Sequence, residues 1–135
     1  MKAVRLYAAN DLRVEDISLP GLPKENEVLI KVIYAGICGS DIHNFLTGSW
    51  ISRSPTTPGH EFSGKIIECG INVKNLKVGD IVIADSRISC EDCFYCNSNK
   101  NYLCENLGFV GELNDGGFAP YTIQKESQLL KVNNS

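Results

Sequence analysis

Apolar residues recur along the chain in short alternating or continuous runs, a pattern typical of β-strands. Residues 2–7 and 12–17 flank the turn-forming segment Ala8-Ala9-Asn10-Asp11, which predicts an N-terminal hairpin. Residues 27–37 contain a long β-branched run, which predicts a central strand with both faces largely buried. Further strands are expected over residues 62–69, 81–84, 118–124 and 128–132.

Only one segment has a helical pattern. Residues 41–46 follow Ser40, which we expect to cap a short helix. Short strands, glycine-containing turns and little helix together predict a mainly β fold, either a barrel or a sandwich. At 135 residues the chain is expected to form one domain over residues 1–135.

Composition and charge narrow the functional classes. The hydrophobic fraction of 43% and the charged fraction of 21% are those of a globular protein. The net charge of −3 and the lack of a basic block argue against a nucleic-acid partner or an acidic membrane surface. No export signal is visible, and no apolar run reaches the roughly 18 residues of a membrane span. We therefore expect a cytoplasmic protein with no membrane partner.

Four of the six cysteines form a C-x2-C-x2-C-x7-C run: Cys90, Cys93, Cys96 and Cys104. Four thiolates can close a tetrahedral cage around zinc that stabilises a loop and has no room for substrate. Disulfides and an iron–sulfur cluster are the alternatives. A reducing cytosol disfavours disulfides, and the last gap differs from the spacing of bacterial ferredoxins. The run therefore predicts a structural zinc lobe at about residues 88–106.

A second, unlike set of candidate ligands lies upstream. Cys38 is bordered by Gly36 and Gly39, and His60-Glu61 follows Gly59. Cysteine and histidine can ligate a catalytic zinc that also needs a third protein group and an exchangeable water. Glu61 could ligate the ion or support a ligand. Each residue also has an ordinary structural interpretation, since a lone cysteine usually packs and a lone histidine often bonds the backbone.

Several motifs resemble one family. Gly59-His60-Glu61-Phe62-Ser63-Gly64, followed by Gly70 and Val73, resembles the signature of the zinc-containing medium-chain alcohol dehydrogenases. Cys38-Gly39-Ser40-Asp41-Ile42-His43 resembles their first-ligand segment, and residues 90–104 resemble their structural zinc lobe. Val78-Gly79-Asp80 and Asp115-Gly116-Gly117-Phe118-Ala119 resemble two further landmarks. The Cys-Gly-Ser-Asp segment followed by histidine is most similar to the polyol, sorbitol, butanediol and threonine dehydrogenases.

This resemblance implies a GroES-like irregular β-barrel with a zinc-bound lobe and few short helices. It implies that Cys38 and His60 ligate a catalytic zinc with Glu61 close by. Ser40 would bond the substrate oxygen and His43 would continue a proton path to solvent, a suitable role for imidazole near neutral pH. Phe45 and Trp50 would line the substrate pocket, although core packing is an equal alternative for both.

The same resemblance implies a substrate, a cofactor and a second domain that binds the cofactor. The substrate would be a small alcohol or polyol, and the cofactor NAD or NADP. No G-x-G-x-x-G motif and no βαβ pattern is present, so we expect the nucleotide-binding Rossmann domain and the third zinc ligand to lie beyond residue 135. The isolated chain is then expected to be inactive. The alternative is a truncated zinc-binding module without catalysis, and a homo-oligomer is left open.

Overall fold

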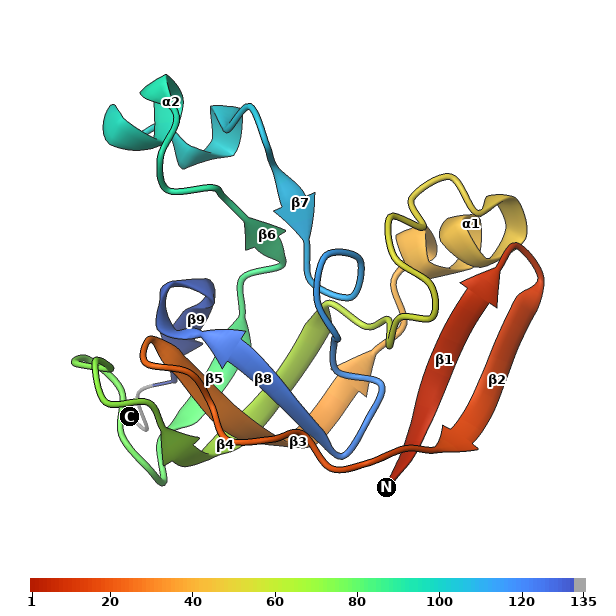
Figure 1. The fold of residues 1–135 in the computed structure, drawn as a ribbon, viewed down its shortest axis with the longest axis horizontal. Coiled ribbons are helices and arrows are strands. Elements are labelled where there is room, and N and C mark those ends of the chain that lie inside the picture. The colour runs from red at the N-terminus through yellow and green to blue at the C-terminus, as the bar shows by residue number, and fades with distance from the viewer. Residues whose placement is uncertain (133–135) are drawn as a thin grey trace.

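The computed structural model describes residues 1–132, and β-strands dominate it (Figure 1). Three antiparallel sheets contain the strands. Two are small: β1 (Lys2–Ala8) pairs with β2 (Asp11–Asp16), and β6 (Arg87–Ile88) pairs with β7 (Gly108–Phe109). The third sheet has five strands in the order β8-β3-β4-β5-β9. Their bounds are β3 (Glu27–Gly36), β4 (Glu61–Cys69), β5 (Ile81–Ala84), β8 (Tyr121–Lys125) and β9 (Leu129–Lys131).

The mainly β prediction is confirmed, and the predicted strands lie close to the observed ones. Within residues 1–132 the two outer strands of the five-stranded sheet, β8 and β9, do not pair with each other, so hydrogen bonds leave this sheet open. Val28, Ile30 and Ile66 are fully buried at its centre. The core cluster consists of Val28, Ile30, Phe62, Ile66, Val82, Val110 and Leu129.

The expectation that β3 is buried on both faces is wrong. Val28 and Ile30 point into the core, whereas Ile33 is 47% exposed and Tyr34 is 76% exposed. The apolar run therefore has only one buried face. Its β-branched residues favour an extended strand whether or not they are covered, which is why composition alone did not distinguish the faces.

Two β-bulges interrupt the long pairing of β3 with β4. Ile67 is an extra residue on β4, between the pairs Leu29–Glu68 and Ile30–Ile66. Ile33 is an extra residue on β3, and beyond it Gly36 pairs with Glu61. Each bulge shifts the register by one residue, and the second shift reverses the first.

Helix α1 (Gly39–Thr47) begins two residues earlier than predicted, and its N-cap residue is Cys38 rather than Ser40. The Asp41 Oδ2 atom accepts a hydrogen bond from the Cys38 backbone N–H at 2.9 Å, which satisfies one N-terminal donor. Gly48 ends the helix with a positive φ of 69°.

The cysteine-rich segment contains helical turns that the sequence did not reveal, α2 (Phe94–Asn97) and the 3-10 helix η1 (Asn101–Leu103). Together with β6 and β7 they form a lobe that projects from the five-stranded sheet (Figure 1). A second 3-10 helix, η2 (Glu126–Gln128), connects β8 to β9. Within residues 1–132 no helix is both long and apolar enough for a transmembrane span.

The segment before β4 is fastened by close backbone contact with the Asp-Gly-Gly turn. The Gly116 N–H donates to the Thr57 carbonyl at 2.7 Å, and the Gly117 N–H donates to the Gly59 carbonyl at 2.7 Å. A Cβ atom at Gly116 would collide with the Gly59 carbonyl oxygen and lie 2.8 Å from that of Pro58. Glycine is required here because the two backbones touch.

Asp115 adds side-chain bonds to the same contact. Its Oδ1 atom accepts hydrogen bonds from the Thr57 N–H at 2.9 Å, from Arg53 at 2.6 Å and from Arg5 at 3.3 Å. The hairpin, the segment 53–57 and the Asp-Gly-Gly turn are thereby joined at one carboxylate. This junction fixes the chain just before His60, which directly precedes β4.

We predict that Gly64→Ala destabilises the fold by about 1–3 kcal/mol, because an added methyl would collide with Ile30 and lie 2.6 Å from the Lys31 carbonyl oxygen. Urea denaturation measures this loss. Gly21→Ala is the matched control, since a Cβ atom there meets nothing within 4 Å. Equal unfolding midpoints for the two variants would contradict the prediction.

Candidate metal centres

The structure brings together the upstream ligand candidates Cys38, His60 and Glu61. One ligand atom from each lies within 4.8 Å of the others. Cys38 follows the end of β3, His60 precedes β4, and Gly36 pairs with Glu61 across the two strands. Residues 22 positions apart thus meet at one end of an antiparallel pair.

Two neighbours orient the His60 ring. Asp41 Oδ1 lies 3.6 Å from Nδ1, and Ser40 Oγ lies 3.4 Å from Nε2. A carboxylate facing Nδ1 favours a proton on that nitrogen, which leaves the Nε2 lone pair available for a metal ion. The same Asp41 side chain bonds the Cys38 backbone through its other oxygen, so one carboxylate aligns both candidate ligands.

A cavity of about 340 Å³ opens beside this cluster. Its lining residues are Ser40, Trp50, His60, Ser86, Leu107, Phe109 and Glu112. The mixture of apolar walls and a few polar groups suits a small organic molecule. His60 is the one of the three candidate ligands that lines this cavity, so a molecule within it would lie against His60 and Ser40.

The other predicted site residues take different positions. Trp50 lines the cavity, and its ring stacks at 39° on the His43 ring, with centroids 4.7 Å apart. His43 is exposed to solvent. Phe45 is half-buried and is absent from the cavity wall, and its carbonyl accepts a hydrogen bond from the Asn10 N–H.

Two carboxylates at this site were not predicted. Asp41 could have been found, because it lies within the first-ligand motif three residues after Cys38, the spacing of an N-capping interaction. Glu112 carries no such signal, since it lies in a turn 52 residues after His60. Burial raises the pKa of Glu112; a positive charge on His60 opposes this and the Asp41 charge reinforces it.

The four cysteines of the C-x2-C-x2-C-x7-C run also lie close together. The Sγ atoms of Cys90, Cys93, Cys96 and Cys104 lie within 4.8 Å of one another. Cys96 Sγ is 3.9 Å from Cys90 Sγ and 3.6 Å from Cys93 Sγ. Sulfur atoms bound tetrahedrally at about 2.3 Å from one zinc ion would stand roughly 3.8 Å apart. The donor set and its spacing fit zinc.

Backbone N–H groups of the lobe stabilise the thiolate forms of two of these cysteines. Hydrogen bonds from the backbone N–H groups of Asp92 and Cys93 lower the pKa of Cys90 to about 6. Backbone donors at Glu105 and Cys96 also lower the pKa of Cys93. Desolvation, followed by hydrogen bonding with Cys93, raises the pKa of Cys96 to about 12. A divalent cation would displace the proton that Cys96 retains.

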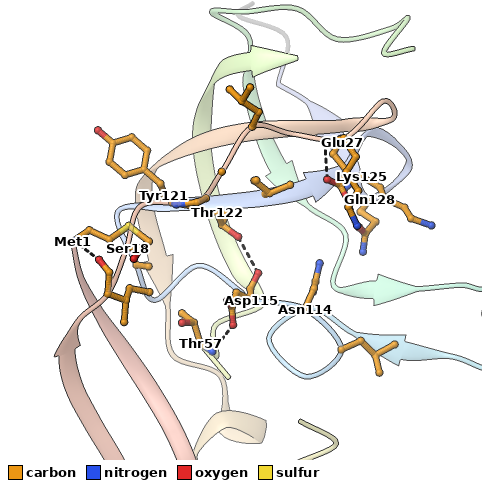
Figure 2. A pocket seen from close by; sticks show the side chains of 18 of the residues that line it. Met1, Ser18, Glu27, Thr57, Asn114, Asp115, Tyr121, Thr122, Lys125 and Gln128 are labelled. Atoms are coloured by element: carbon orange, nitrogen blue, oxygen red, sulfur yellow. Dashed lines mark hydrogen bonds between the residues drawn. The ribbon is translucent and has the colours of Figure 1, made fainter. Parts of the chain in front are cut away.

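A larger cavity, of about 560 Å³, is lined by other residues, and Figure 2 shows the side chains around it. No residue of either ligand set lines it. Thr57 and Thr122 donate hydrogen bonds to Asp115 at 2.9 Å, so these polar groups serve the fold (Figure 2). Asn114 Oδ1 and Gln128 Nε2 are buried without a partner in the described part of the chain.

These features agree with comparisons to known proteins. Residues 24–134 match the family "Alcohol dehydrogenase GroES-like domain". The chain therefore belongs to the zinc-containing medium-chain alcohol dehydrogenase family, as the motifs had indicated.

The sequence relatives include enzymes acting on several alcohols. The chain is 40% identical over 119 residues to L-threonine 3-dehydrogenase of Caldanaerobacter subterraneus, which covers 84% of this chain and 34% of that protein. It is 42% identical over 118 residues to D-arabitol-phosphate dehydrogenase of Enterococcus avium, and this match covers 84% of this chain and 32% of that protein. The chain spans about a third of the length of these relatives.

A solved structure shows the same fold. A zinc-binding dehydrogenase from Sinorhizobium meliloti, bound to NADP, superposes with a TM-score of 0.90 at 36% identity. The match covers 98% of this chain and 38% of that one. The GroES-like fold prediction is thereby confirmed.

We predict that Cys93→Ala opens the lobe, because three thiolates cannot complete the tetrahedral cage that holds residues 90–104. Metal analysis should show the loss of one tightly held zinc ion, and limited proteolysis should cut the lobe first. Cys69→Ala is the control, since Cys69 belongs to neither ligand group. Unchanged zinc content and protease resistance in Cys93→Ala would contradict a structural zinc site.

Proposed function

We propose that this chain is the catalytic domain of a zinc-dependent NAD(P) alcohol or polyol dehydrogenase. Cys38, His60 and Glu61 would hold the catalytic zinc, and the cysteine lobe would hold the structural one. The observation that carries the proposal is the convergence of these three ligand candidates beside a cavity that Ser40 also lines. A closed structural site would leave no such space.

The reaction would be oxidation of a secondary alcohol to a ketone, with hydride transfer to the nicotinamide. Zinc, when bound, supplies Lewis acidity that lowers the pKa of a substrate hydroxyl. Ser40 can accept a hydrogen bond from that hydroxyl and take up its proton as it passes its own proton on. Asp41 holds the His60 ring, 3.6 Å away, in the orientation that a ligand requires.

The proton path would end at His43. This imidazole is exposed to solvent and lies one helical turn after Ser40 on α1. Imidazole is the side chain best suited to exchange protons with water near neutral pH. The His43 ring packs at a tilt of 39° against that of Trp50, which lines the cavity.

The domain would act only together with further parts of a longer protein. Relatives are about three times as long as this chain, and nucleotide binding needs a βαβ unit that residues 1–132 do not contain. We propose that this unit, and a third protein ligand for the catalytic zinc, are supplied from outside residues 1–135. A zinc-stabilised binding module without catalysis is the alternative, and the closed thiolate lobe is compatible with it.

We predict that the chain binds two divalent ions and that His60→Ala loses only one of them. Cobalt(II) titration distinguishes the two sites, because the thiolate cage gives intense sulfur-to-metal charge transfer while the mixed site gives a different spectrum. His43→Ala is the matched control, since this exposed histidine lies outside both ligand groups. A single ion in the wild-type chain, unaffected by His60→Ala, would favour the non-catalytic module.

We predict that the purified 135-residue chain, loaded with zinc, does not oxidise alcohols in the presence of NAD or NADP. The physical reason is that hydride transfer needs the nicotinamide ring held against the substrate, and residues 1–132 contain no βαβ unit to bind the cofactor's phosphates. Absorbance at the wavelength of reduced nicotinamide measures turnover. Measurable metal-dependent turnover would show that the chain is sufficient.

A further inference from the structure

Glu112 is held rigidly at the wall of the metal-site cavity. Its backbone N–H donates to the Phe109 carbonyl at 3.1 Å, and its carbonyl accepts a hydrogen bond from Ser52 Oγ at 3.1 Å. The preceding Gly111 has a φ of 87° and donates to the Asn114 carbonyl at 3.0 Å. These contacts fix the turn from both sides, so the side chain leaves it in a defined direction.

The Glu112 side chain lines the cavity together with Ser40 and His60. A narrower recess next to this cavity is also bordered by Glu112, Asp41 and His60. Among the described residues 1–132, the Glu112 carboxylate takes part in neither a hydrogen bond nor an ion pair. By contrast, Asp41 Oδ2 accepts a hydrogen bond from the Cys38 N–H, and Asp41 Oδ1 lies 3.6 Å from His60 Nδ1. Glu112 is therefore available to a molecule in the cavity.

We propose that Glu112 is a specificity-determining residue of this pocket, selecting substrates that carry a hydrogen-bond donor beside the reacting carbon and disfavouring those that carry an anionic group there. This inference rests on the proposed function. A carboxylate offers only acceptors, so it pairs with a hydroxyl or an ammonium group. It repels a phosphate at the same distance, and partial burial reduces the screening of that repulsion.

The relatives show why this distinction matters. One is named for an amino alcohol, L-threonine, and another for a phosphorylated polyol, D-arabitol phosphate. The metal ligands cannot separate such substrates, because all of them present a hydroxyl to the metal. Discrimination must come from groups on the cavity wall, and Glu112 is the acidic residue on the wall of the 340 Å³ cavity beside His60.

The test is a binding measurement on the zinc-loaded chain with three probes: D-arabitol, D-arabitol phosphate and L-threonine. Amide chemical shifts of residues 40, 50 and 60 report binding at the cavity. Glu112→Gln keeps the size and an acceptor oxygen but removes the charge. We expect it to improve binding of D-arabitol phosphate relative to D-arabitol by about five- to tenfold, the size of one Coulombic contact in a wet site. L-threonine carries an ammonium and a carboxylate group on one carbon, so the two charge effects oppose each other, and its affinity relative to D-arabitol should change less than that of D-arabitol phosphate.

Glu68→Gln is the matched control, because it removes the same charge from an exposed position on β4. Unchanged relative affinities in Glu112→Gln would overturn the inference, as would an equal change in Glu68→Gln. Shifts absent from residues 40, 50 and 60 with all three probes would also overturn it. Cobalt(II) spectra separate these outcomes from failure of the proposed function, because a second ion lost by His60→Ala would still support the catalytic metal site.

Discussion

The candidate catalytic site depends on the contact between two backbones, those of residues 57–59 and 116–117. Hydrogen bonds of 2.7 Å join them, and the glycine at position 116 is the only residue type small enough for that approach. Asp115 strengthens the contact from its side chain by bonding Thr57 and two arginines. His60, the residue before β4, is therefore held at a fixed point. Its position near Cys38 follows from these backbone contacts and from the pairing of β3 with β4.

The two ligand groups differ in how they are supported. Cys38, His60 and Glu61 lie at the end of a sheet with a packed core behind it, and Asp41 aligns two of them. The thiolate lobe has no such core: its helices and strands are only two to four residues long. Short elements of this kind are unstable without a crosslink. A zinc ion held by the four thiolates would therefore stabilise the lobe, whereas the upstream ligand candidates are positioned by the fold.

Much of this arrangement could be predicted from the sequence because the chemistry depends on residue type and spacing. The cysteine run and the His60-Glu61 pair were recognisable, and the β-branched segments gave most of the strands. The turns of α2 and η1 were missed because sulfur convergence, rather than helix propensity, shapes residues 94–103. Ser40 was assigned as the cap because hydroxyl side chains commonly cap helices, but the observed start places Ser40 inside the helix and its hydroxyl against His60. Glu112 could not be predicted as a site residue from the sequence, because only the tertiary fold brings its turn to the cavity.

The paired bulges in β3 and β4 have a consequence for how this site can change during evolution. Ile33 and Ile67 each stand unpaired between two pairs, so losing either one would remove its bulge and leave the pairs on both sides, including Gly36 with Glu61, in place. Each strand can therefore lose one residue at its bulge while the ends that carry Cys38 and His60 keep their partners. Deletion of a paired residue has no such outlet, because it would turn the following side chains to the opposite face of the sheet.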